Sequence, residues 1–166
     1  PKAADLDRAA RGVERWLETA ARLDDGELAA FARTWAEDPA GRQFLDALLG
    51  NSPFLGNALV AEMAFAREFL ETGPDAAFAG LLAGLTERLA GETSETNDAV
   101  IMTALRRTKR RAALLIAAAD IAGLWTLEAV TGALSDFAER ALGLALAYLL
   151  RRAADQGQLN PADRAA

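Results

Sequence analysis

Apolar residues recur every three or four positions along most of this chain, which is the spacing of one face of an α-helix. No stretch alternates β-branched and polar residues, so the sequence predicts no sheet. We therefore expect an all-α fold, a single bundle of about seven to eight helices around one continuous core. The first predicted helix runs from Leu6 to Leu23 and carries an apolar face of Leu6, Ala9, Val13, Trp16, Leu17 and Ala20.

Capping and proline signals divide the first half of the chain into further helices. A capping-box pattern at residues 24–27 begins the second, and Asp38-Pro39 places an N-cap before a proline at the start of the third. We expect the third helix to end at Gly50. Ser52-Pro53 repeats the start signal, and the apolar stripe after it is one helix to Glu71 or two helices with a break near Met63.

The second half shows a similar pattern with longer helices. Thr72-Gly73-Pro74 ends one helix and starts the next, and residues 91–96 are the best candidate for a loop. A helix from Asn97 to Ala119 comes next. Thr126 is expected to cap a short helix that ends at Val130, before a longer helix over 133–154. The inner face of that longer helix is predicted to comprise Leu134, Phe137, Ala138, Ala141, Leu142, Ala145, Tyr148 and Leu149.

Positive charge is concentrated in the helix predicted over 97–119, although the chain has 18 Lys and Arg against 24 Asp and Glu and a net charge of −6. On a helical wheel the Lys and Arg side chains of this helix occupy one arc and the apolar residues occupy the other. Beyond Arg111 the helix is apolar on all sides. We expect the charges to project from one end of the bundle. They are either a phosphate or partner contact site or a helix face that nearby carboxylates neutralise. The candidate site residues are Arg106, Arg107, Lys109, Arg110 and Arg111.

Other kinds of site are disfavoured by composition. The chain has no Cys and no His, so it lacks a thiolate and the usual general base near neutral pH. It has no P-loop and no G-x-S-x-G motif. Asp5-Leu6-Asp7 resembles a magnesium-binding pair, but helix capping explains two aspartates at a helix start. We therefore predict no catalytic residue and no metal site, and the acidic balance argues against nucleic-acid binding.

Chain length and hydropathy indicate the number of domains and the location that we expect for this protein. Its 166 residues are enough for one helical domain, which we assign to 1–166. No signal peptide is visible, and the apolar runs are shorter than a membrane span of about 20 residues, so we expect a cytoplasmic protein that does not bind membranes. The first residue is Pro1 and the end is rich in alanine, which indicates a piece of something longer.

Two stretches resemble one enzyme family. NSPFLGNAL (51–59) and LRRTKRRAALLIAAADIAGLWTLEAVTGALSDFAERAL (105–142) are similar to the helical region that precedes the first catalytic domain of bacterial bifunctional glutamine synthetase adenylyltransferase/deadenylylases. The resemblance covers 51–159, whereas 1–50 carry little family signal.

The resemblance implies a function for a parent protein rather than for this segment alone. Enzymes of the family attach AMP to a tyrosine of glutamine synthetase and remove it by phosphorolysis, and a PII signalling protein regulates the balance. Their nucleotidyltransferase domains use a G-x-E-L-N and D-x-D motif with Mg, ATP or ADP and phosphate. Here GQLN (157–160) is followed by Pro161 and by no D-x-D, so no catalytic residue of the family maps onto this chain.

The sequence supports two hypotheses. The preferred one is a noncatalytic helical N-terminal segment of such an enzyme, without a cofactor of its own, that contacts the downstream catalytic domain and the partners glutamine synthetase and PII. The alternative is a self-contained helical interaction module whose basic patch binds an acidic protein.

Overall fold

The computed structural model describes residues 2–90 and 97–159, and within these ranges it contains eight helices and no strand, as the sequence predicted. The expected loop at 91–96 lies outside the described residues. The helices are α1 (Leu6–Arg22), α2 (Gly26–Glu37), α3 (Pro39–Asn51), α4 (Pro53–Ala61), α5 (Met63–Thr72), α6 (Pro74–Ala90), α7 (Asp98–Ile121) and α8 (Leu127–Asp155).

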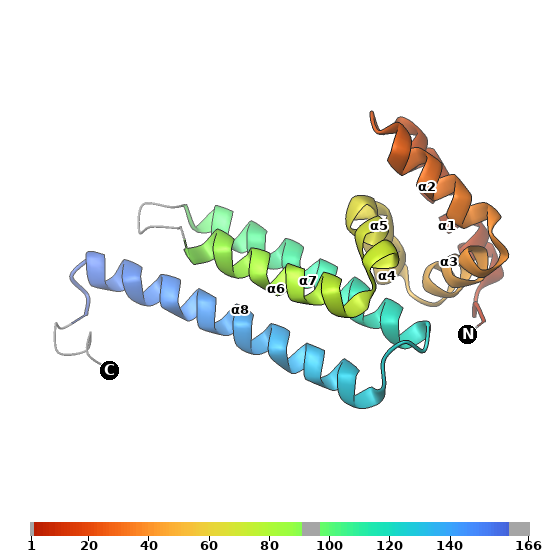
Figure 1. Ribbon diagram of the computed structural model, residues 1–166. Helices are drawn as coiled ribbons and strands as arrows, with labels where there is room; N and C mark the ends of the chain where they lie inside the picture. The colour runs from red at the N-terminus through yellow and green to blue at the C-terminus, as the bar shows by residue number, and fades with distance from the viewer. Residues whose placement is uncertain (1, 91–96, 160–166) are drawn as a thin grey trace.

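The helices form two groups joined by the short α4 and α5 (Figure 1). At the N-terminal end α1 packs against α2 and α3. At the other end α6, α7 and α8 lie side by side as long helices. One end of α7 reaches α3, α4 and α5, so this helix connects the two groups.

Polar caps begin most of the helices where the sequence indicated. The carboxylate of Asp5 accepts a hydrogen bond from the Arg8 amide at 2.8 Å, which gives Asp5 a capping role. A side-chain oxygen accepts a backbone N–H in the same way at Asp25, Asp38, Ser52, Asn97 and Thr126. These short-range contacts explain why helix starts were predictable.

Buried residues form two clusters rather than the single continuous core that we expected. The larger cluster joins α1 to α5 with the apolar half of α7 and the N-terminal turns of α6 and α8, and Trp16, Leu48 and Leu115 lie completely inside it. The smaller cluster lies between α6, α7 and α8 and includes Leu89 and Tyr148. The half-buried Phe137 packs against both.

Two predicted boundaries are wrong. Helix α3 continues one residue beyond Gly50, to Asn51. Gly50 serves close packing within the helix, since a Cβ there would lie 2.6 Å from the Ala3 Cβ. Helix α8 runs unbroken from Leu127, and the expected division near Val130 does not occur. Glycines that do end helices have positive φ angles, as at Gly73 (88°) and Gly123 (70°).

The predicted inner face of the last helix is also partly wrong. Phe137 and Tyr148 turn inward, but Leu142 is 71% exposed. Six leucines of α8 are exposed, and we call them the α8 stripe: Leu127, Leu134, Leu142, Leu146, Leu149 and Leu150. Helix α8 contacts only α6 and α7 closely, so its packed face is narrower than its apolar surface.

Candidate functional site

A single turn between α4 and α5 places a carboxylate inside the molecule. Glu62 continues the helical hydrogen bonding on both sides, since its N–H donates to Ala58 O at 2.9 Å and its carbonyl accepts from Ala66 N at 2.8 Å. Its backbone nevertheless departs from helical angles, with φ −116° and ψ 38°. The stripe after Pro53 is therefore two helices, and Glu62 at their junction is only 3% exposed.

Three arginines of the predicted basic cluster surround this carboxylate. Arg111 Nε donates to Glu62 Oε2 at 2.6 Å, and Arg110 Nε donates to Oε1 at 3.0 Å, with a further short contact from Arg110 Nη2. Arg107 Nε lies 3.4 Å from Oε2. The Arg111 guanidinium also stands 5.1 Å from the centre of the Phe65 ring, a cation–π arrangement. We call Glu62 with these three arginines the Glu62 cluster.

The arginines keep Glu62 ionised despite its burial. Desolvation acts to raise the pKa of this carboxyl, but hydrogen bonds from Arg110 and Arg111 and their positive charges outweigh it. The pKa of Glu62 is therefore lower than the ordinary value of 4.5. The side chains of Arg107, Arg110 and Arg111 stay 58%, 42% and 25% exposed, so each retains access to solvent.

The five predicted site residues thus divide into two sets. Arg107, Arg110 and Arg111 converge on Glu62, whereas Arg106 and Lys109 are exposed and make no ion pair or side-chain hydrogen bond within 2–90 or 97–159. The charges lie in the middle of α7 beside the α4–α5 junction, not at an end of the bundle as expected. Contact of any of the five with phosphate or a partner stays a prediction.

Sequence reasoning missed Glu62. A usable signal was present, because Glu62 is a charged residue inside an otherwise apolar stripe and coincides with the expected helix break. The sequence does not place it opposite residues 107–111, which are more than forty positions away along the chain.

A second polar contact fastens the far ends of α7 and α8. The hydroxyl of Tyr148 donates to the Asp98 carboxylate at 2.9 Å, and Arg152 pairs with the same oxygen. Hydrogen bonds from Arg152 and Tyr148 lower the pKa of Asp98. Burial of the Tyr148 hydroxyl, together with its hydrogen bond to the Asp98 carboxylate, raises the pKa of Tyr148. This contact fixes the register of α8 on α7.

Two other kinds of site are not found in the residues that the structure describes. No group of three or more acidic side chains there is placed to hold a metal ion. No helix in the same residues is long and apolar enough to cross a bilayer.

The geometry of the described residues is that of a helical segment with an internal carboxylate–guanidinium cluster, and comparison with known proteins identifies its family. The family model for glutamate-ammonia ligase adenylyltransferase matches residues 42–166, and the chain belongs to this family. No solved structure matches it.

Relatives with the name bifunctional glutamine synthetase adenylyltransferase/adenylyl-removing enzyme match most of the chain. The protein of Xanthobacter autotrophicus is 39% identical over 86% of this chain. That of Bradyrhizobium sp. (strain ORS 278) is 35% identical over 96% of it. The chain spans only 14% and 15% of the lengths of these two relatives, so it corresponds to a short region of each.

Proposed function

We propose that this chain is a noncatalytic helical segment of an enzyme that attaches AMP to glutamine synthetase and removes it by phosphorolysis. The observation that carries the proposal is the family match, together with the small share of each relative that the chain spans. The chemistry, with Mg, ATP or ADP and phosphate, belongs to the rest of the longer protein, because this sequence has no strand-borne G-x-E-L-N and D-x-D motif. PII and a cytoplasmic location remain part of the proposal.

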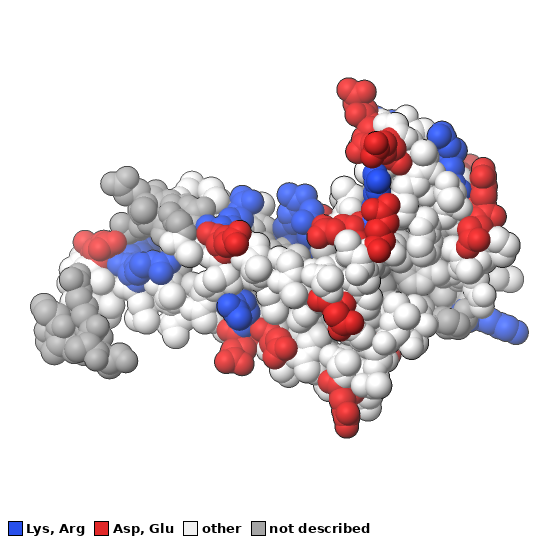
Figure 2. All heavy atoms as spheres, in the orientation of Figure 1, with Lys and Arg blue, Asp and Glu red and all other residues white. Residues whose placement is uncertain are grey.

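The α8 stripe supports a docking role within that longer protein. Leu127 and Leu142 are 77% and 71% exposed, and Figure 2 shows that uncharged surface alternates with acidic and basic groups along the visible side of α8. Fully burying one exposed leucine side chain is favourable by about 1.5–3 kcal/mol, so six exposed leucines are costly to leave in water. About 85% of each relative's length lies outside the matched region. We infer that this part of the longer protein supplies the surface that buries the exposed leucines. We assign the stripe to contact with the downstream catalytic domain.

We predict that charges on the stripe separate this segment from the rest of the enzyme. The segment and the remainder, produced as two polypeptides, are expected to associate, and Leu142→Glu with Leu146→Glu weakens the association by about 100-fold or more because two carboxylates must be desolvated. Leu6→Glu with Met102→Glu is the matched control, since both residues are exposed but lie outside α8. Sedimentation or light scattering measures the complex. Equal loss in both variants, or self-association of the segment without binding to the remainder, contradicts the assignment.

We also predict a functional effect at the two exposed cations of α7. In the longer enzyme, Arg106→Ala with Lys109→Ala is expected to slow release of AMP from adenylylated glutamine synthetase about tenfold, because each residue offers a charge to a phosphate or acidic group. Its melting temperature should stay close to wild type, since neither side chain holds another described residue. Arg110→Ala is less informative because it also removes a partner of Glu62. Arg33→Ala with Arg88→Ala controls for charge, and unchanged phosphorolysis in the test variant would remove these residues from the site.

The alternative function is a self-contained module that binds an acidic partner, and the gene sequence beyond Ala166 distinguishes it from the enzyme. A strand with G-x-E-L-N and D-x-D within a few tens of residues supports the enzyme, and a stop codon there supports the module. In both cases we expect the isolated segment to transfer or remove no AMP.

A further inference from the structure

A long groove runs between α1 and α4, on the opposite group of helices from α8. It consists of two hollows of about 430 Å³ each, which share Arg15 and Asn57. The first is lined by Arg8, Arg11, Gly12, Arg15, Leu49, Pro53, Gly56 and Asn57. The second is lined by Arg15, Thr19, Leu23, Leu28, Asn57, Val60, Ala61, Met63 and Ala64. The groove is therefore basic at one end and mainly apolar at the other.

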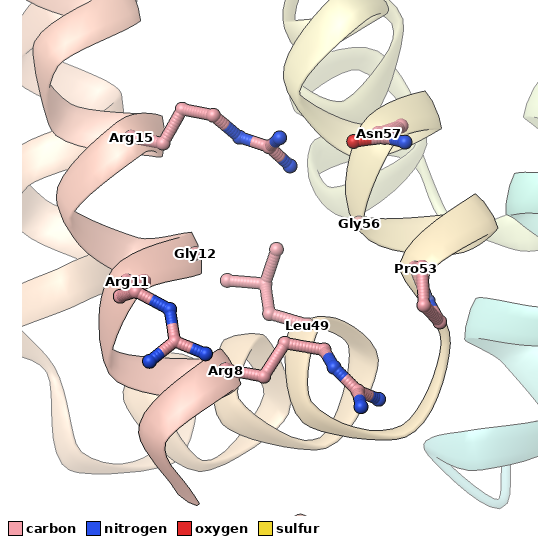
Figure 3. Close-up of a pocket in the computed structure, with 8 residues that line it drawn as sticks. All are labelled: Arg8, Arg11, Gly12, Arg15, Leu49, Pro53, Gly56 and Asn57. Carbon is pink, nitrogen blue, oxygen red and sulfur yellow. The ribbon is translucent and has the colours of Figure 1, made fainter. Parts of the chain in front are cut away.

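The basic end carries more positive charge than its neighbours neutralise. Arg8 is partly neutralised, since it lies 3.0 Å from the Asp5 carboxylate and donates to Gly50 O at 3.3 Å. Arg11 and Arg15 are exposed and form no ion pair with the part of the chain that the structure describes. Figure 3 shows the Arg15 side chain reaching from α1 toward α4, with the guanidinium groups set apart from one another.

Two glycines allow α1 and α4 to pack closely against Leu49 at this end. A Cβ on Gly12 would lie 2.8 Å from the Leu49 Cβ, so only glycine allows α1 to approach Leu49 this closely. On the opposite wall, a Cβ on Gly56 would lie 3.3 Å from the Leu49 Cδ2, and Arg15 Nη2 is the next side chain, at 3.9 Å. The floor of this hollow is thus Leu49, which lies between the backbones of Gly12 and Gly56, and the arginines form the rim of the hollow (Figure 3).

The apolar end begins within reach of the arginines. Leu23 is 41% exposed and Val60 is half-buried, and both line the second hollow next to Arg15. Along α1 the distance from Arg8 to Leu23 is about 22 Å at 1.5 Å per residue. A ligand that fills both hollows is therefore elongated, with negative groups at one end and apolar groups at the other.

We propose that this groove binds a segment of a separate partner protein in which acidic residues adjoin apolar residues. Arg8 and Arg15 are about 10 Å apart along α1, which suits successive carboxylates of a peptide better than one small anion. Charge complementarity directs the acidic part to Arg11 and Arg15, and Leu23 and Val60 receive the apolar part. That the partner is a separate protein rests on the proposed function, in which the remainder of the same polypeptide already contacts the α8 stripe.

Fluorescence anisotropy with labelled peptides tests the groove directly. Three peptides of about 15 residues are used, one with a Glu-rich block before a Leu-containing block, one with the blocks reversed and one scrambled, because two such blocks span about 22 Å as a helix. We expect one of the two block peptides to bind at least tenfold more tightly than the scrambled peptide. Arg11→Ala with Arg15→Ala should weaken that binding tenfold or more, and Leu23→Ser should weaken it by a smaller factor.

The matched control is Arg33→Ala with Arg88→Ala, which removes equal charge from exposed positions outside the groove and should leave the affinity unchanged. Loss of binding in this control but not in the Arg11 and Arg15 variant places the acidic ligand outside the groove and overturns the proposal. Two further results overturn it: no binding of either block peptide at about 1 mM, or complete competition by inorganic phosphate at a similar concentration, which defines a small-anion site. Circular dichroism of each variant checks that it is folded. No enzyme activity is measured, so failure here leaves the proposed function standing.

Discussion

Replacing Glu62 with alanine is expected to lower the free energy of unfolding by about 2–3 kcal/mol, because it leaves three arginines facing one another without a carboxylate. Loss of one partner of a fully buried ion pair costs about 3–5 kcal/mol, and the smaller figure applies here because the arginines stay in contact with water. Denaturant unfolding followed by circular dichroism measures the change. Glu68→Ala is the matched control on the exposed side of α5 and should change stability by less than about 0.5 kcal/mol.

The Glu62 cluster also has a definite pH dependence. The pKa of Glu62 is lowered in the folded protein and returns to about 4.5 on unfolding. The charge of Glu62 therefore makes its full contribution to the free energy of unfolding above pH 4.5. That contribution is lost as the pH falls through the pKa of Glu62 in the folded protein. The stability difference between wild type and Glu62→Gln should be constant from pH 7 to about 5 and narrow below pH 4.5. A difference that does not narrow in acid would mean that the charge of Glu62 does not stabilise the fold.

The second large effect is expected at Trp16. Its ring is completely buried in the N-terminal group, and its Nε1 donates to Ala32 O at 3.3 Å. Trp16→Ala leaves a cavity between α1 and α2 and removes this hydrogen bond, so we expect a loss of about 3–5 kcal/mol in the free energy of unfolding.

Two variants separate the contributions of the Trp16 ring. Trp16→Phe keeps most of the volume and removes the N–H, and it should cost about 1–2 kcal/mol. Trp125→Ala is the comparison at a half-buried indole, which packs edge-on against Phe78 with ring centres 5.9 Å apart. Thermal unfolding compares the three variants. A loss at Trp125 as large as that at Trp16 would contradict the assignment of Trp16 to the main core.

Much of the fold was predictable because its signals are local. A cap such as Asp25 or Ser52 acts on an amide three residues later, so the helix start is encoded within one turn. Helical periodicity likewise identified Trp16 and the apolar half of α7 as buried. The close packing of Gly50 was not predictable in this way, because the approach of Ala3 depends on packing between distant segments.

The face of α8 shows the limit of periodicity. Leu142 and Tyr148 both belong to the apolar pattern, but only Tyr148 faces the neighbouring helices. An apolar arc wider than one packed face leaves its inner side undetermined until α6 and α7 are in place. The pattern therefore predicted a buried face, whereas the structure has a buried face and an exposed stripe.

The sequence by itself determined that this chain is helical, where most of its helices begin, and that its positive charge gathers on α7. These properties depend on neighbours within one or two helical turns. Only the tertiary structure decided that Arg107, Arg110 and Arg111 enclose Glu62, that Arg106 and Lys109 remain exposed, and that α1 and α4 form a groove. The Glu62 cluster and the groove join residues that lie far apart in the sequence, and packing of the whole chain brings them together.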